Sequence, residues 1–353
     1  MRSTRPKPLH LLCGRAMVLY VLGALPASEL ERAVVVVGHG AERVTKKLTE
    51  DGAWLPLEFV EQSQQRGTGD AVAVGLTGLP DDDGDEDDRD VLVLPGDTPL
   101  LRPETVAELV AEHRHSGAAC TILTARLEDP TGYGRIVRVG KDDRIARIVE
   151  QTDATSDEIG IDEINTGIFC FRRSLLAPAL RLVHPDNAQG EYYLTDVVEV
   201  LADAGHKVVS VVAADPSETA GVNDRAQLAA AEAGLRERTN REWLARGVTM
   251  VDPAATYIDT TVTLAADVTI FPGAILQGRT VIGRGVEIGP GCRLVDTTVG
   301  EQSSLEHTVA RLSEIGADCQ VGPYAVLEAG SQIPSGTRTG PFYTASTAAG
   351  LDD

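Results

Sequence analysis

The stretch Val91-Leu92-Val93-Leu94-Pro95-Gly96-Asp97-Thr98-Pro99-Leu100-Leu101 joins an unbroken apolar run to a carboxylate. Parallel strands are covered on both faces and lack polar alternation, so the run predicts a buried parallel strand that stops before Asp97. Ligands of open α/β sheets bind outside the carboxyl ends of the strands, where an acid can hold a divalent cation against a phosphate. The alternative is that Asp97 only caps a turn, and this stretch alone leaves the two interpretations even.

Length and composition narrow the class of protein. A chain of 353 residues is long enough for two domains, each with its own core. The formal net charge of -21 argues against nucleic acid or a membrane surface as a partner, because both need a basic face. Part of that charge lies in the run from Asp81 to Asp88, which we interpret as a solvated loop. The scattered cysteines and the absence of a long apolar run or leader predict a soluble cytoplasmic protein.

Helix and strand patterns alternate along the first two thirds of the chain, after a polar and irregular opening that reaches His10. Helices are predicted at 16–22, 71–76 and 104–115, and strands at 33–38, 57–60, 119–124, 145–150 and 163–171. This alternation predicts a doubly wound sheet, and residues 225–245 predict a long connecting helix. Gly67-Thr68-Gly69 stands at a strand-to-helix junction, where free amides could face a ligand, although a plain helix N-terminus would use the same residues.

A six-residue period dominates the sequence after Gly247. The aliphatic residues that carry it are Ile258, Leu264, Ile270, Leu276, Ile282, Ile288 and Leu294, then Ile315, Val321, Leu327 and Ile333, with a slip near Val299 and Leu305. A sandwich of short strands would instead show turns every 8 to 12 residues or so. The fixed period predicts a triangular parallel β-helix.

Short motifs follow one another in a fixed order along nearly the whole chain. They are Pro6-Lys7-Pro8-Leu9-His10, Gln62 with Gly67-Thr68-Gly69, Gly96-Asp97-x-Pro99-Leu100, Gly132-Tyr133-Gly134-Arg135-Ile136, Val149-Glu150-Gln151-x-Asp153-Ala154, Glu163-x-Asn165-x-Gly167, Glu191-x-Tyr193-Leu194-Thr195-Asp196, Gly221-Val222-Asn223 and the hexapeptide repeats. Together they resemble the bifunctional bacterial N-acetylglucosamine-1-phosphate uridyltransferase/glucosamine-1-phosphate acetyltransferase family. The resemblance implies a Rossmann-like nucleotidyltransferase domain over 1–224, a connecting helix over 225–247 and a left-handed β-helix over 248–353.

The resemblance also implies a reaction and its partners. UTP and N-acetylglucosamine 1-phosphate would give UDP-N-acetylglucosamine and pyrophosphate with Mg²⁺, for the cell-wall precursors of peptidoglycan and lipopolysaccharide. The β-helix would form a homotrimer. The alternatives are a nucleotidyltransferase for another hexose 1-phosphate or nucleotide, and a non-catalytic UDP-sugar-binding or scaffold protein.

The family's functional residues carry over to matching positions. Asp97 and Asn223 would hold Mg²⁺, and Lys7 would neutralise charge on the phosphates. The uracil and its ribose would be bound by Gln62, Gly67 and Thr68, and the sugar ring by Gly134, Glu150 and Asn165. Taken singly, each has an ordinary role: Lys7 as a surface cation, Glu150 as a strand-end acid, Asn223 as a helix cap.

Two departures from the family pattern modify this expectation. The family's first strand and Gly-rich phosphate loop precede the position of Met1, so we expect a chain truncated there to bind UTP weakly. The basic residues that bind the acceptor sugar phosphate align with Glu328 and Ser346, and later coils with the catalytic His lie beyond Asp353. A carboxylate repels a phosphate, so the acetyltransferase half is expected to be inactive.

Overall fold

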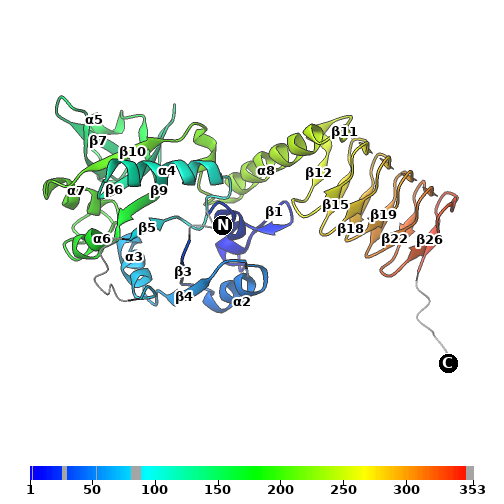
Figure 1. Cartoon of the computed structure of the whole chain (residues 1–353), viewed down its shortest axis with the longest axis horizontal. Helices are drawn as coiled ribbons and strands as arrows, with labels where there is room; N and C mark the ends of the chain where they lie inside the picture. Colours follow the sequence, from blue (N-terminus) through cyan, green and yellow to red (C-terminus); the bar gives the residue numbers. More distant parts are fainter. Residues whose placement is uncertain (2, 26–29, 53, 81–88, 347–353) are drawn as a thin grey trace. The chain divides into compact units, whose positions relative to one another are not determined.

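The computed structural model describes the chain except residues 2, 26–29, 53, 81–88 and 347–353, so the predicted acidic loop at Asp81–Asp88 lies outside the described residues. Internal contacts divide the chain into two units. Unit 1 comprises Met1–His10 and Met17–Asp224, and unit 2 comprises Leu11–Ala16 and Arg225–Asp353. Figure 1 colours both units by sequence.

Unit 1 alternates helices with strands, as predicted. Its elements are η1 Lys7–Leu9, α1 Met17–Gly23, β3 Ala33–Val37, α2 Ala41–Asp51, β4 Leu57–Glu61, α3 Thr68–Leu76, β5 Asp90–Val93, α4 Pro103–Ser116, β6 Cys120–Arg126, β7 Arg135–Val139, β8 Arg144–Val149, α5 Ser156–Ile159, β9 Glu163–Arg172, α6 Arg173–Leu180, α7 Asp196–Asp203, β10 Val208–Val212 and η2 Pro216–Thr219. Local sequence explains several boundaries. Helix α4 begins with Pro103, whose fixed φ suits the first turn, and ends before Gly117, which adopts a left-handed φ of 61°. The opening segment, predicted to be irregular, contains the short helix η1.

The sheets of unit 1 combine parallel and antiparallel pairs. Strands β3 and β4 are parallel, as are β6 and β10. Strand β9 is antiparallel to β5 and β6 and meets β7 at one residue pair. Its residues Ile168, Phe169, Cys170 and Phe171 are all buried, because β9 is covered on both faces. The predicted α/β nucleotidyltransferase fold is confirmed.

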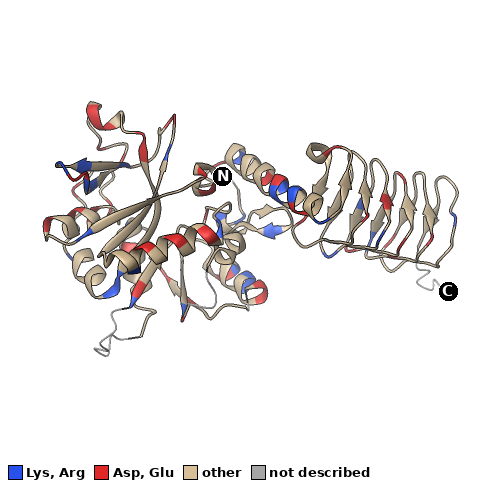
Figure 2. Cartoon of the chain, turned by 45° about the horizontal axis from the view of Figure 1, so that its top comes forward, with Lys and Arg blue, Asp and Glu red and all other residues tan. Residues whose placement is uncertain are grey.

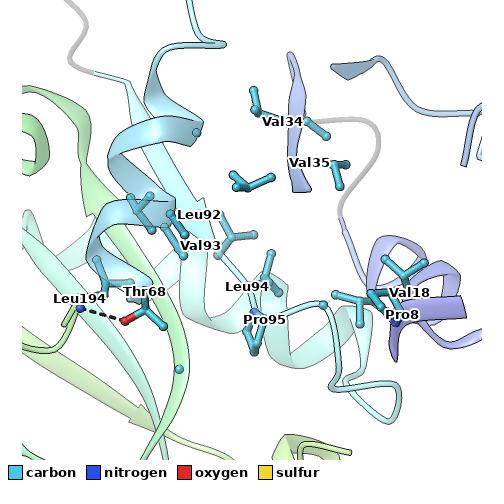
Figure 3. A pocket seen from close by; sticks show the side chains of 18 of the residues that line it. Pro8, Val18, Val34, Val35, Thr68, Leu92, Val93, Leu94, Pro95 and Leu194 are labelled. Carbon is cyan, nitrogen blue, oxygen red and sulfur yellow. Dashed lines mark hydrogen bonds between the residues drawn. The ribbon is translucent and has the colours of Figure 1, made fainter. Parts of the chain in front are cut away.

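Strand β5 corrects one prediction. The run at Val91 was expected to be a buried parallel strand, but β5 is antiparallel to β9 and its residues Val91–Val93 are only half-buried. Val91–Val93 are not fully buried because they line a cavity of about 1100 Å³, which is lined by β5 on one side and β3 on the other. Figure 3 shows Val34 and Val35 of β3 and Leu92 and Val93 of β5 around it. Among the described residues, β3 pairs only with β4 and β5 only with β9.

Unit 2 contains a long helix, a short hairpin and a parallel β-solenoid. Helix α8 spans Arg225–Ala245, as predicted, and the hairpin pairs β1 Leu11–Leu12 with β2 Arg15–Ala16. The solenoid strands are β11 Thr249–Met250, β12 Tyr257–Ile258, β13 Thr263–Leu264, β14 Thr269–Ile270, β15 Ile275–Gln277, β16 Val281–Ile282, β17 Glu287–Ile288, β18 Arg293–Val295, β19 Thr298–Val299, β20 Ser304–Leu305, β21 Val309–Arg311, β22 Glu314–Ile315, β23 Gln320–Val321, β24 Val326–Leu327, β25 Gln332–Ile333 and β26 Thr344–Ala345, with η3 Pro253–Ala255 near the start. Every third strand pairs in parallel, giving three sheets that match a left-handed β-helix.

The core of the solenoid confirms the six-residue period. All of the predicted periodic aliphatic residues are buried. A second set, two positions earlier, is buried with them and includes Val262, Val268, Ala274, Val286 and Cys292. The predicted slip also has a structural cause. Ile275 pairs with a residue eighteen positions on, whereas Arg293 pairs with Val309, sixteen positions on, so one coil is two residues shorter.

Acidic and basic residues both occur along the described chain (Figure 2), with acidic residues in the majority over the full sequence. Figure 2 shows acidic and basic residues together along α8, where Glu237 pairs with Arg241 at 2.5 Å and Glu242 with Arg246 one turn later. Such exposed pairs contribute little stability, roughly 0.3–0.5 kcal/mol each. Within the described parts of the chain, no helix is long and apolar enough to cross a bilayer.

Candidate active site

Three side chains from distant parts of the sequence converge in unit 1. Lys7, in η1, donates hydrogen bonds from Nζ to Asp97 Oδ2 and, at 2.6 Å, to Asn223 Oδ1. The backbone holds the two acceptors together, because the Val222 amide donates to the Asp97 carbonyl oxygen at 2.9 Å. A carboxylate oxygen and an amide oxygen therefore surround one positive charge.

This arrangement is suited to a divalent cation. The Lys7 ammonium stands where the Asp97 and Asn223 oxygens meet, and oxygens of these kinds are the ligands that Mg²⁺ and Ca²⁺ prefer. The described residues include no group of three or more His, Cys, Asp or Glu that could hold a metal ion. A site with so few protein ligands is typical of Mg²⁺, which keeps several waters and takes substrate phosphates as further ligands.

The loop between β4 and α3 is folded around Gln62. The Gln62 side-chain amide donates to Asp70 Oδ2 at 2.8 Å and to the Gly67 carbonyl at 3.3 Å. Gly67 has φ 113°, and a Cβ there would lie 2.5 Å from the Tyr192 carbonyl oxygen. Helix α3 starts at Thr68, three residues before the predicted start at Ala71. The glycine therefore permits both the backbone turn and a close approach to the neighbouring segment.

That neighbouring segment, residues 192–194, is bonded to the loop along its length. The Gly69 amide donates to the Tyr192 carbonyl and the Tyr192 amide donates to the Arg66 carbonyl, both at 2.8 Å. The Leu194 amide donates to Thr68 Oγ1 at 3.0 Å, the bond drawn in Figure 3. The position of the loop thus depends on a segment more than a hundred residues away in the sequence.

A second group of predicted residues, Gly134, Glu150 and Asn165, also lies together. The Asn165 amide donates to the Gly134 carbonyl at 2.8 Å. A Cβ on Gly134 would lie 3.3 Å from Glu150 Oε2, so the carboxylate rests against this glycine. Burial raises the pKa of Glu150, a hydrogen bond from Thr195 lowers it, and the charge of Asp153 raises it. Glu150 is therefore a half-buried carboxylate that accepts a hydrogen bond from the Thr195 hydroxyl.

The predicted site residues gather around one cavity of unit 1. Lys7, Gln62, Thr68, Glu150, Asn165 and Asn223 line the cavity of about 1100 Å³. The three others, Gly67, Asp97 and Gly134, are in direct contact with lining residues through the bonds and contacts described above. The structure leaves none of the nine predicted residues apart from this group.

Sequence reasoning missed Arg135, whose buried side chain holds the turn beside the site in place. Its side chain is 1% exposed, donates from Nη1 to the Tyr133 carbonyl and donates from Nη2 to Gln151 Oε1 at 2.8 Å. The same Gln151 oxygen accepts from the Gly132 amide at 3.2 Å. Arg135 thereby ties the turn that carries Gly134 to the end of β8. Its only sequence signal was its place beside Gly134 in a motif.

Comparison with known proteins identifies the family. A family model described as nucleotidyl transferase matches residues 2–233. The bifunctional protein GlmU of Streptomyces avermitilis is 46% identical over 343 residues, which cover 97% of this chain and 70% of the relative. GlmU of Brevibacillus brevis is 44% identical, with 97% of this chain and 72% of the relative covered. The chain belongs to the GlmU family.

GlmU membership confirms the predicted family and the predicted enzyme class, a nucleotidyltransferase with uridyltransferase activity, and supports formation of UDP-N-acetylglucosamine. It also indicates a nucleotide and a sugar phosphate as substrates, and a divalent metal. A crystal structure of UDP-glucose pyrophosphorylase complexed with UDP-glucose superposes with a TM-score of 0.52 at 13% identity, covering 67% of this chain and 92% of that one. At that identity the likeness concerns the fold alone.

Proposed function

We propose that unit 1 transfers a uridylyl group from UTP to N-acetylglucosamine 1-phosphate. A phosphate oxygen of the sugar phosphate attacks the α-phosphorus of UTP in line, the bond from that phosphorus to the bridging oxygen breaks, and pyrophosphate leaves with the electron pair. No covalent enzyme intermediate is needed, because positioning and charge neutralisation supply the catalysis. The observation that carries the proposal is the meeting of Lys7, Asp97 and Asn223 at one cavity in a GlmU-family chain.

Each predicted residue has a place in this proposal. Asp97 and Asn223 would hold Mg²⁺, which would supply charge neutralisation at the phosphate oxygens. Lys7 would neutralise further charge on the phosphates of the substrates. Gln62, Gly67 and Thr68 bind the uracil and ribose. Gly134, Glu150 and Asn165 bind the N-acetylglucosamine ring.

The wider organisation is proposed from the same resemblance. Residues 1–224 form the uridyltransferase domain, 225–247 the connecting helix and 248–353 a β-helix that assembles a homotrimer. The product serves the synthesis of peptidoglycan and lipopolysaccharide precursors in the cytoplasm, a location in keeping with five cysteines that are all thiols. Glu328 is an exposed acid after β24. By the resemblance it would occupy the family's acceptor-phosphate position, where a carboxylate would repel the phosphate, and we therefore propose that acetyl transfer is absent.

Pyrophosphate release with UTP, N-acetylglucosamine 1-phosphate and Mg²⁺ tests the proposal, together with a panel of other nucleoside triphosphates and hexose 1-phosphates. Asp97→Asn should lower turnover by orders of magnitude and leave the circular dichroism spectrum unchanged. Asp142→Asn, in the exposed turn between β7 and β8, is the matched control and should keep normal turnover. A higher kcat/KM with another substrate pair would favour the alternative nucleotidyltransferase. Calorimetric binding of UDP-N-acetylglucosamine without turnover would favour a binding or scaffold protein.

A further inference from the structure

The hydroxyl of Thr195, at the start of α7, is bonded to the carboxylate of Glu150. Thr195 is the N-cap residue of α7, where a threonine hydroxyl normally accepts a hydrogen bond from an amide of the first turn. Here the side chain makes no capping bond and instead donates from Oγ1 to Glu150 Oε1 at 3.1 Å. Thr195 is 5% exposed, and both residues line the cavity of the site. Thr195 has helical backbone angles, φ -61° and ψ -29°, so its hydroxyl is not placed to cap the helix and bonds the carboxylate instead.

The location of Thr195 is fixed by the nucleotide side of the site. The preceding residues, Tyr192 and Leu194, are bonded to Arg66, Thr68 and Gly69 of the loop before α3. Thr195 therefore lies at the end of a segment anchored to that loop, with its hydroxyl on the opposite, sugar side. One short segment joins the two halves of the site.

The charges around Glu150 make this hydroxyl important. Asp153, Asp196 and Tyr193 interact electrostatically with Glu150, and none of them carries a positive charge. Burial, with Glu199, Glu150 and Asp153, raises the pKa of Asp196 to about 6, which shows how acidic the surroundings are. Burial likewise raises the pKa of Glu150, while the Thr195 hydrogen bond favours its charged form.

We propose that Thr195 is a positioning residue that holds one oxygen of Glu150, so that the carboxylate faces the cavity as the acceptor for the sugar hydroxyls. This inference rests on the proposed function, because it deepens the role of Glu150 in sugar binding. A carboxylate held by one donor keeps lone pairs free for a second donor, which the substrate supplies. Loss of the hydroxyl lets the side chain rotate and take up a proton, and a protonated carboxyl is a poorer acceptor.

Kinetics of Thr195→Val and Thr195→Ser test the proposal. Valine keeps the β-branched shape and removes the donor, so the KM for N-acetylglucosamine 1-phosphate should rise about tenfold or more, while the KM for UTP stays within about twofold. The acid limb of the kcat/KM profile for the sugar phosphate should move to higher pH. Serine keeps the donor and should restore most of the sugar affinity. Thr121→Val, which removes a buried hydroxyl bonded to His113 outside the cavity, is the control for a purely structural effect.

A titration of Glu150 by carbon NMR gives a readout that needs no turnover. Its pKa should be higher in Thr195→Val than in the native protein, and Thr195→Ser should reverse the change. In a Glu150→Ala background, which removes the acceptor, Thr195→Val should have no additional effect on the sugar phosphate KM. An unchanged Glu150 pKa and an unchanged sugar phosphate KM in Thr195→Val would overturn the inference. Absence of uridylyl transfer by the native chain would instead contradict the proposed function, and the NMR titration would still decide the role of Thr195.

Discussion

Replacing Gly67 with alanine tests how the loop before α3 is held. Gly67 has φ 113°, and an added Cβ would lie 2.5 Å from the carbonyl oxygen and 2.9 Å from the amide nitrogen of Tyr192. Backbone atoms cannot yield as a flexible side chain can, so the loop must move away from residues 192–194. The movement breaks the bonds from the Gly69 amide to the Tyr192 carbonyl and from the Tyr192 amide to the Arg66 carbonyl.

The size of the effect follows from these bonds. Alanine at a positive φ costs roughly 1–3 kcal/mol by itself. Two lost hydrogen bonds add about 0.5–1.5 kcal/mol each, hence about 1–3 kcal/mol together. Gly140→Ala is the matched control: Gly140 also has a positive φ, 80°, but a Cβ there meets nothing within 4 Å. Both variants place alanine at a positive φ, whereas only Gly67→Ala brings the new Cβ against the backbone of a neighbouring segment.

Amide hydrogen exchange measures this difference where it arises. In Gly67→Ala, the amides of Gly69 and Tyr192 should exchange at least roughly 5- to 150-fold faster than in the native protein, because the two lost hydrogen bonds alone make local opening easier by about 1–3 kcal/mol. In Gly140→Ala, the same two amides should exchange at native rates. The KM for UTP should rise in Gly67→Ala only. Native protection of both amides in Gly67→Ala would show that the loop accommodates a side chain, and the assignment of Gly67 to the nucleotide loop would lose its structural basis.

Three further predictions concern charge. Burial opposes ionisation of Glu163, but hydrogen bonds from Arg138 and Thr124 hold its pKa below the usual 4.5. The ionised Glu163 therefore contributes stability above that pH, and this stability is lost as pH falls through the folded pKa. In urea unfolding, Glu163→Gln should reduce the loss of stability at acid pH, and an unchanged pH dependence would refute the assignment. Chelation of divalent ions should abolish pyrophosphate release and Mg²⁺ should restore it, whereas persistent activity in excess chelator would exclude the Asp97–Asn223 cation site. If Glu328 occupies the proposed acceptor position, acetyl-CoA should give no CoA release dependent on glucosamine 1-phosphate, and release well above that of an unrelated protein would contradict this.

Local patterns were enough for much of the fold. The six-residue period predicted the solenoid because each coil packs mainly on the next, so the same short pattern recurs wherever the same short-range contact recurs. Helix α8 was predicted with its observed bounds, Arg225–Ala245, since a composition of good helix formers acts within the helix itself. The site residues came from motifs whose order resembles a family, and the order of motifs is also a property of the sequence alone.

Tertiary structure decided the features that depend on distant partners. An apolar run at Val91 predicts a strand. Only the pairing with β9 makes that strand antiparallel, and only the cavity that it shares with β3 leaves it half-buried. Leu11–Ala16 belongs to unit 2 although both flanking segments belong to unit 1, a result that no local pattern encodes. Thr195 bonds Glu150, 45 residues earlier in the sequence, because a hydroxyl takes the partner that the packed chain places within its reach. Periodicity and composition act over a few residues, whereas strand direction and side-chain partners are fixed by contacts between segments that only folding brings together.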